Sequence, residues 1–367
     1  MQEGQKSKSL NIIPSIFLCI ATAVLIILSF PKVDFGFLAW FALIPFFIAL
    51  EGKTMKQAFW LGFLTGYLVF AGTLHWLFHI TQWFGVIAGI GILFLYSYLA
   101  LYYAAFAVGY VYFAKRTIVW KLILIPSLWT ALEFIRAHLF SGFDWVSLGY
   151  SQYRDFEINL IAAYTGVLGV SFCIVFVASV LSWLYKRWPR CVVVFCMLCS
   201  FYLYIEYLPW TRKITPMEKH TLILQPNIDQ DRKFSQVESE SILDDHIAQT
   251  KQAMEKGTDQ LAFIIWPETA FTAFVGLDDE LFFRLKDFVR EVQTPLLFGA
   301  VEYVDGKYYN AAILLNKDGE VEQKYHKNHL VPFGEYIPLP FIGEYLGIGN
   351  FTAGKEKTLF TYPGFEH

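Results

Sequence analysis

The distribution of charged residues divides this chain into two parts suited to different solvents. Residues 1–208 contain 13 Lys/Arg and 8 Asp/Glu, about 10% of that part, whereas residues 209–367 contain 16 and 24, about 25%. Ordinary globular domains carry about 25% charged residues, so only the second part has the composition of a soluble protein. We therefore expect a membrane domain, followed by an acidic, water-soluble domain of about 160 residues.

Seven apolar runs in the first part predict a polytopic α-helical membrane domain over residues 11–208. A hydrocarbon layer about 30 Å thick requires roughly 20 apolar residues in a helix, in which every backbone polar group is paired. The second run is short and the fourth is long, so these two could tilt or re-enter the membrane. The runs lie at 11–30, 35–50, 58–78, 85–114, 118–138, 158–185 and 191–208.

The loop charges predict the orientation of these helices. Lys and Arg collect on the cytoplasmic side of short loops. Alternate loops carry nine on one side and three on the other, which places residues 1–10 in the cytoplasm. Seven crossings then place residues 209–219, read as a linker, and 220–367 outside. The nine are Lys6, Lys8, Lys53, Lys56, Lys115, Arg116, Lys186, Arg187 and Arg190, and the three are Lys32, Arg136 and Arg154.

Polar residues within the apolar runs allow two interpretations each. His75 and His79 could share one helix face as a metal pair, although an interfacial or substrate-facing role is favoured. Glu133 and Arg136 could be functional at membrane depth, although an i, i+3 ion pair near the interface is favoured. The loop over residues 141–150 could lie on the membrane surface near a lipid-facing mouth, or simply connect two helices.

From His220 onward the pattern changes to short strands that alternate with amphipathic helices. Asp318-Gly319 is expected to form a hairpin turn. This alternation predicts a mixed, layered α/β domain. Strands are expected at 221–225, 261–266, 295–299, 309–315 and 321–325, and helices at about 237–256 and 278–292.

Several classes of function are excluded or disfavoured. Neither part is strongly basic, so nucleic acid is not an expected partner. The second part has no phosphate loop, no G-x-S-x-G, no H-E-x-x-H and no complete dinucleotide fingerprint, so we expect no nucleotide cofactor. It also has no cysteine, which excludes an internal disulfide and a Cys₂His₂-type zinc site. The cysteines are Cys19, Cys173, Cys191, Cys196 and Cys199, all within apolar runs.

Two segments of the second part carry candidate catalytic groups. In Trp266-Pro267-Glu268-Thr269 a carboxylate directly follows a buried strand, where it could act as a general base, although Pro-Glu also begins helices well. In Tyr325-His-Lys-Asn-His-Leu-Val-Pro-Phe-Gly-Glu335, Lys327 lies in a segment of restricted backbone, where an ammonium could stabilise an oxyanion. A surface charge cluster is the alternative for this second segment.

These segments resemble bacterial apolipoprotein N-acyltransferase, a membrane enzyme of the nitrilase superfamily. The resemblance covers nearly the whole chain in order: the apolar helices, Gln225-x-Asn227, Trp266-Pro267-Glu268, Tyr309-Asn310 and Lys327-x-His329-Leu-Val-Pro-Phe-Gly-Glu335. It implies that residues 220–367 form a nitrilase-like (CN hydrolase) domain of the αββα sandwich type, on the periplasmic side of the inner membrane.

The resemblance also implies the chemistry. Glu268 would be the general base and Lys327 would stabilise the oxyanion, with Glu335, Tyr325 and His329 as supporting residues and no metal or cofactor. A thiolate would take an acyl chain from a phospholipid and pass it to the α-amine of a diacylglyceryl-cysteine on an apolipoprotein. This would be the last step of lipoprotein maturation.

The sequence departs from the family at the nucleophile. The family's cysteine follows the Phe-Thr-x-Gly segment, here Phe351-Thr-Ala-Gly354, but no cysteine follows Cys199. We therefore expect a C-terminally truncated domain, or one half of a split enzyme whose second fragment supplies the cysteine. A truncated pseudoenzyme and a membrane-tethered nitrilase-type amidase are the alternatives. Phe234 is a smaller departure, because the family is expected to have Trp there, in a substrate-contacting loop.

Overall fold

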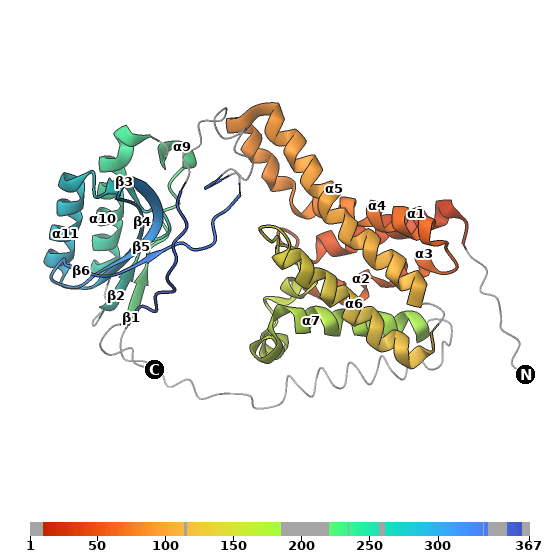
Figure 1. The fold of residues 1–367 in the computed structure, drawn as a ribbon. Coiled ribbons are helices and arrows are strands. Elements are labelled where there is room, and N and C mark those ends of the chain that lie inside the picture. The colour runs from red at the N-terminus through yellow and green to blue at the C-terminus, as the bar shows by residue number, and fades with distance from the viewer. Residues whose placement is uncertain are drawn as a thin grey trace, which may run out of the picture. The chain divides into compact units, whose positions relative to one another are not determined.

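The computed structural model describes residues 10–113, 116–184, 220–233, 235–256, 261–332, 334–336 and 351–361. The chain divides into two compact units, Met1–Trp210 and Thr211–His367 (Figure 1). The predicted apolar run at 191–208, the linker 209–219 and Phe234 lie outside the described residues.

The secondary-structure elements described in the first unit are all helices, joined by turns and loops. Its core is formed by apolar side chains of α1, α3, α4, α5, α6 and α7. In chain order the elements are α1 (Ile12–Leu28), η1 (Gly36–Leu38), α2 (Ala39–Ala42), α3 (Ile44–Leu50), α4 (Met55–Thr73), η2 (His75–Ile80), α5 (Thr81–Phe113), α6 (Ile118–His138), η3 (Leu148–Gln152) and α7 (Phe156–Leu184).

Three helical segments of this unit are long and apolar enough to cross a membrane: Gly85–Phe113, Ile118–His138 and Ile158–Leu184. A bent pair, Met55–Thr73 with His75–Trp83 at 61°, would make a fourth if it forms one span. The apolar helices α1 and Gly36–Leu50 are shorter. These helices coincide with predicted runs and confirm the expectation of apolar membrane helices, whereas the total of seven crossings and the orientation derived from it remain predictions.

Buried polar groups hold the loop that follows α6. Glu133 is 6% exposed and accepts hydrogen bonds from Trp129 Nε1 at 2.9 Å and from the backbone N–H of Leu148 at 2.7 Å. Arg136 is 3% exposed and donates to the carbonyl of Trp145 at 2.6 Å and to Ser147 Oγ at 2.9 Å. Since buried charges need polar partners, the expected ion pair is replaced by two anchors for residues 145–148.

The two histidines near the end of α4 do not form the metal pair considered above. They belong to η2, a 3₁₀ helix with three residues per turn, so residues four apart do not share a face. His75 Nδ1 lies 2.8 Å from the carbonyl of Gly72. Within the described ranges, no group of three or more His, Cys, Asp or Glu side chains is arranged to hold a metal ion.

The second unit is built on one six-stranded mixed sheet. Its strand order is β1-β2-β4-β5-β6, with β3 also paired to β4. β1, β2, β3 and β4 pair in parallel, whereas β4, β5 and β6 pair antiparallel. The elements are β1 (His220–Ile223), α9 (Gln230–Lys233), η5 (Gln236–Glu238), α10 (Ser239–Glu255), β2 (Leu261–Ile265), β3 (Phe271–Val275), α11 (Asp279–Val292), β4 (Leu296–Val304), β5 (Lys307–Leu315) and β6 (Val321–His326).

Helices α10 and α11 lie beside each other along the sheet (Figure 1). The apolar residues Leu285, Phe288 and Val289 of α11 pack with Phe298 and Ile313 of the sheet in one buried cluster. Because side chains alternate along a strand, the residues between these core positions point to the opposite face. That opposite face carries the candidate site.

The fold class agrees with the prediction: apolar helices, followed by a mixed α/β domain. Both predicted helices, the five predicted strands and the Asp318-Gly319 turn are present, and Gly319 adopts the positive φ of 73° that such a turn requires. One strand, β3, was not predicted, because Pro267-Glu268 suggested the end of the strand and the start of a helix. The described residues form one sheet, so the four-layer αββα arrangement remains a prediction.

Candidate active site

Glu268 lies in a break between two strands that share one neighbour. β2 pairs with Leu296 and Leu297 of β4, and β3 pairs with β4 from Ala300 onward. Between these stretches the chain leaves the regular strand, and Thr269 adopts a positive φ of 53°. At this break the N–H of Gly299 donates to the carbonyl of Pro267 at 3.2 Å. Such an irregularity in a strand changes the direction in which a side chain points, here that of Glu268.

Gly299 is required for this close approach. A Cβ atom at position 299 would lie 2.5 Å from Glu268 Cα and 2.6 Å from Thr269 N. We predict that Gly299→Ala destabilises the second unit by about 1–3 kcal/mol, because the backbone on either side must move apart. Denaturant unfolding measures the loss. Gly334→Ala is the control, since its Cβ would meet Val331 only at 3.5 Å; equal stability of the two variants would contradict the prediction.

Lys327 directly follows β6 and is held by its backbone on both sides. Its N–H donates to the carbonyl of Asn310 at 2.8 Å, and its carbonyl accepts from the N–H of Gly354 at 3.0 Å. These bonds continue the pairing of β5 with β6, so the side chains of Asn310 and Lys327 emerge on the same face of the sheet. Their backbone positions are therefore set by the sheet register.

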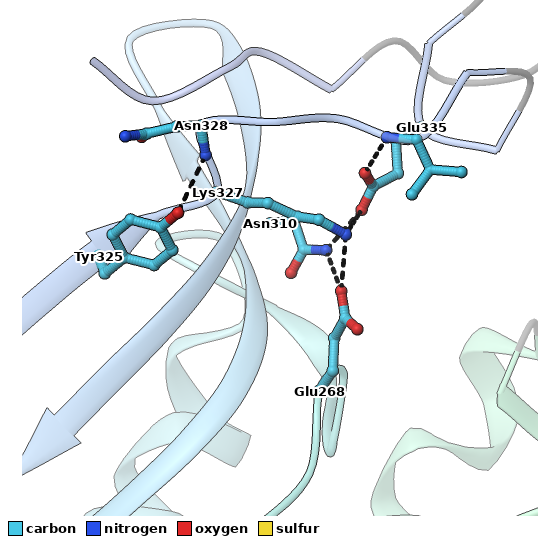
Figure 2. A network of polar contacts seen from close by, with 7 residues as sticks. Glu268, Asn310, Tyr325, Lys327, Asn328 and Glu335 are labelled. Atoms are coloured by element: carbon cyan, nitrogen blue, oxygen red, sulfur yellow. Dashed lines mark hydrogen bonds and ion pairs between the residues drawn. The ribbon is translucent and has the colours of Figure 1, made fainter. Parts of the chain in front are cut away.

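Four polar side chains meet on this face (Figure 2). Lys327 Nζ donates to Glu335 Oε1 at 2.9 Å and to Glu268 Oε1 at 3.2 Å. Asn310 Nδ2 donates to the same two oxygens, at 2.6 Å each. Glu335 is held further through Oε2, which accepts from the backbone N–H of Val331 at 2.7 Å. An ammonium and an amide thus bridge two carboxylates that are far apart in the sequence.

The two carboxylates have different environments. The Glu335 side chain is 13% exposed, whereas that of Glu268 is 62% exposed and that of Lys327 is 28% exposed. Burial alone would raise the pKa of Glu335, but the N–H of Val331 and the donors of Lys327 and Asn310 outweigh burial and lower this pKa. Burial alone would lower the pKa of Lys327, but its bonds to Glu335 and Glu268 raise it. Glu335 therefore remains an anion beside the ammonium, and Glu268 is the carboxylate that solvent or substrate can reach.

These shifts predict how stability depends on pH. A lowered carboxylate pKa stabilises the fold above its unfolded value of about 4.3, and that stabilisation is lost as the pH falls through the folded pKa. A raised lysine pKa stabilises the fold below its unfolded value of about 10.4. That stabilisation is lost as the pH rises through the folded pKa. We therefore expect Glu335→Gln to be less stable than the wild type between about pH 5 and pH 10.

The difference in stability between Glu335→Gln and the wild type should narrow as the pH falls below the unfolded value of about 4.3 and through the lowered pKa of Glu335. The unfolding midpoints of both proteins, measured at a series of pH values, give this difference. Glu320→Gln, at an exposed carboxylate 3.6 Å from Arg290, is the control and should show little change, because exposed pairs contribute little. A difference that stays constant from pH 7 to pH 3 would contradict the prediction.

The structure brings together Glu268, Lys327 and Glu335, the three charged residues singled out from the sequence. Within the described part of the chain, Tyr325 makes no hydrogen bond to the two carboxylates. Its hydroxyl accepts from the N–H of Asn328 at 3.2 Å and so stabilises the backbone that follows Lys327 (Figure 2). His329 is exposed, and its supporting role remains a prediction. Asn310 was not predicted as a site residue, although Tyr309-Asn310 belonged to the resemblance; only the register of β5 against β6 reveals its contacts.

The described cysteines, Cys19 and Cys173, belong to the first unit, in α1 and α7. The described part of the second unit therefore brings together carboxylates, an ammonium and an amide, but no sulfur nucleophile. Such a set can abstract a proton and stabilise an oxyanion, which are two of the three operations of acyl transfer.

Comparisons with known proteins agree with this division of the chain. The family described as "Apolipoprotein N-acyltransferase N-terminal domain" matches residues 22–180, and the family described as "Carbon-nitrogen hydrolase" matches residues 223–358. Among solved structures, a carbon-nitrogen hydrolase from Helicobacter pylori G27 is 19% identical with a TM-score of 0.28, covering 37% of this chain and 44% of that chain.

Two curated relatives match most of the chain. The apolipoprotein N-acyltransferase of Geobacter metallireducens is 34% identical over 364 residues, covering 92% of this chain and 69% of that protein. The apolipoprotein N-acyltransferase of Pasteurella multocida is 29% identical over 368 residues, covering 93% of this chain and 69% of that protein. The apolar helices, the carbon-nitrogen hydrolase domain and these identities together show that this chain belongs to the apolipoprotein N-acyltransferase family.

Proposed function

We propose that this protein transfers an acyl chain from a phospholipid to the α-amine of the diacylglyceryl-cysteine at the N-terminus of an apolipoprotein. Glu268 acts as the general base, and Lys327 stabilises the oxyanion. Glu335 and Asn310 hold these two groups in place. The reaction proceeds through a thioester on a cysteine.

The observation that carries the proposal is the shared ammonium. Lys327 Nζ lies 3.2 Å from Glu268 and 2.9 Å from Glu335, so the two carboxylates and one ammonium have a net charge of −1. When Glu268 takes up a proton, the cluster becomes neutral and Lys327 loses one of its two anionic partners. Its N–H can then turn towards a new negative oxygen, which is the requirement of an oxyanion-stabilising group.

In the first half-reaction Glu268 accepts the proton of the thiol, and the thiolate attacks the ester carbonyl of the phospholipid. The negative charge that develops on the carbonyl oxygen is stabilised by Lys327. The carbon–oxygen bond to the glycerol then breaks, and Glu268 returns the proton to the departing lysophospholipid oxygen. The products are a thioester and a lysophospholipid.

In the second half-reaction the α-amine of the acceptor attacks the thioester carbonyl. Glu268 accepts one proton from the amine, and Lys327 again stabilises the oxyanion. The carbon–sulfur bond breaks, an amide forms, and the proton returns to the sulfur. One base and one cation therefore serve both half-reactions, and the proposed steps use no metal or cofactor.

The thiol in this proposal comes from a segment other than these 367 residues, either a continuation of the same chain or a second fragment. The five cysteines of the first part are unsuitable, because all lie within apolar runs of the sequence and a thiol in apolar surroundings is a poor source of thiolate. We further propose that the site faces the periplasm from the inner membrane. A reporter fused after residue 215 tests this: activity only in the periplasm supports the orientation, and activity only in the cytoplasm contradicts it.

An acyl-transfer assay tests the function. The protein, expressed from its own gene in membranes, is incubated with an acyl-labelled phospholipid and a diacylglyceryl-cysteine peptide. We expect the label to appear on the peptide as an amide, with a transient protein band that hydroxylamine removes. Membranes with an empty vector give the background.

Three other outcomes would contradict the proposal. Release of ammonia from a small amide without acyl transfer would favour an amidase. Lipid binding without any labelled product, also after a cysteine-containing fragment is supplied, would indicate a non-catalytic protein. Transfer that survives hydroxylamine at every time point would exclude a thioester.

A further inference from the structure

A second charged cluster lies on the opposite face of the sheet, directly behind Lys327. Glu302 of β4 has a side chain that is only 4% exposed. His326 Nε2 lies 2.6 Å from Glu302 Oε2 and donates to it, and the ammonium of Lys324 contacts Oε1 of the same carboxylate. His326 and Lys324 both belong to β6, so one buried carboxylate contacts two side chains at the C-terminal end of that strand.

These contacts span the width of three strands. β5 lies between β4 and β6, and Glu302 pairs with Tyr309 of β5 in the sheet register. The Tyr309 ring stacks on the His326 ring with 4.2 Å between centroids and 17° between planes. The cluster therefore joins β4 and β6 across β5 through side chains, in addition to the backbone bonds between neighbouring strands.

The position of this cluster matters because β6 ends next to Lys327. Successive side chains of a strand point to opposite faces, so His326 points to Glu302 while Lys327 points to Glu268 and Glu335. β6 pairs with β5 on one side, and no other described strand pairs with it. Without the cluster, the end of β6 would be held by backbone bonds to β5 and by the bond from Gly354.

We propose that Glu302 is a positioning residue, which through His326 and Lys324 fixes the backbone from which the Lys327 ammonium reaches the site. The inference rests on the role proposed for Lys327, but it does not involve contact of Glu302 with any substrate. A displacement of about 1 Å at a reacting group can slow a reaction about 100-fold. Glu302 therefore affects the rate of the chemical step and not the binding of lipid or acceptor.

The first test is the accessibility of the Lys327 amine, which is independent of any enzymatic activity. The folded protein is treated briefly with an amine-reactive acylating reagent, and the modification rates of Lys327 and Lys251 are compared in the same sample by mass spectrometry. We expect Glu302→Gln to raise the ratio of these rates about fivefold, because Lys327 leaves its two carboxylates more often. Glu320→Gln should leave the ratio unchanged.

The second test is kinetic. Glu302→Gln should lower kcat for acyl transfer about 10- to 100-fold, with KM for phospholipid and for acceptor within about twofold of the wild type. His326→Ala, at a side chain that is 28% exposed, should give the same pattern and replaces Glu302→Gln if that variant does not fold. The conservative variant His326→Gln, whose amide can still donate to Glu302, should recover part of kcat.

The two proposals fail in different ways. An unchanged ratio for Lys327 in a folded Glu302→Gln variant would overturn the positioning role, whatever the activity. A raised ratio in a protein whose wild type shows no acyl transfer would overturn the proposed function and leave the positioning role standing. A rise in KM without a fall in kcat would also overturn the positioning role.

Discussion

Replacing Glu268 by glutamine is expected to slow acyl transfer by about 10²- to 10⁴-fold, the usual contribution of a general base. Glutamine keeps the shape of the side chain and an oxygen that can still accept from Lys327 and Asn310, but it cannot take up a proton. Because the Glu268 side chain is 62% exposed, the fold should be almost unaffected. The initial rate of amide formation and the midpoint of thermal unfolding are the two measurements.

Glu320→Gln is the matched control for Glu268→Gln. Its carboxylate is 65% exposed and lies 3.6 Å from Arg290, so it resembles Glu268 in exposure but lies outside the site. It should retain the wild-type rate. If Glu268→Gln also transfers acyl chains at the wild-type rate, another group is the base and the proposed role of Glu268 is wrong.

Replacing Lys327 by methionine is expected to affect both activity and stability. Loss of an oxyanion-stabilising donor slows reactions by about 10²- to 10³-fold. The change also leaves Glu335, which is 13% exposed, beside Glu268 without the cation between them. We expect a loss of about 1–3 kcal/mol in the free energy of unfolding, or roughly 2–10 °C in Tm for a unit of this size.

Lys251→Met is the control for this variant. Lys251 binds Glu291 at 2.6 Å, and both side chains are exposed; exposed pairs contribute about 0–1 kcal/mol. The rate of acyl transfer and the unfolding midpoint are compared for both variants. If Lys327→Met is as stable as Lys251→Met at pH 7, the ammonium does not hold the two carboxylates together as the structure indicates.

The lowered pKa of Glu335 gives the two largest effects a common physical origin. Glu335 is charged at neutral pH because backbone and side-chain donors outweigh its burial. This fixed anion holds the Lys327 ammonium beside Glu268. In the proposed reaction the exposed carboxylate of Glu268 would change its charge, whereas the less exposed carboxylate of Glu335 would not. Two carboxylates in different environments can in this way take different roles.

Much of the fold could be predicted because its signals are local. The charge contrast on either side of Pro209 separates the membrane part from the soluble part. The alternation of apolar residues marks both helices and five strands of the second unit. Glu268 stands out because it follows an apolar strand. Lys327 and Glu335 stand out because their segment combines bulky apolar residues with Pro332 and Gly334.

Other features depend on contacts between distant segments, and the sequence did not reveal them. The strand β3 was missed because Pro267-Glu268 interrupts it locally, whereas β4 holds the chain on both sides of the break. Glu133 and Arg136 were expected to pair with each other, but the folded loop offers better-placed partners in Leu148 and Trp145.

By itself, the sequence determined the apolar helices, the α/β character of the second part and the residue types suited to acyl transfer, since hydropathy and periodicity act over a few turns or strands. Only the tertiary structure decided that Asn310 joins the site and that Glu302 lies behind Lys327. The physical reason is register: which side chains meet across a sheet depends on strand pairing between residues that are far apart in the chain.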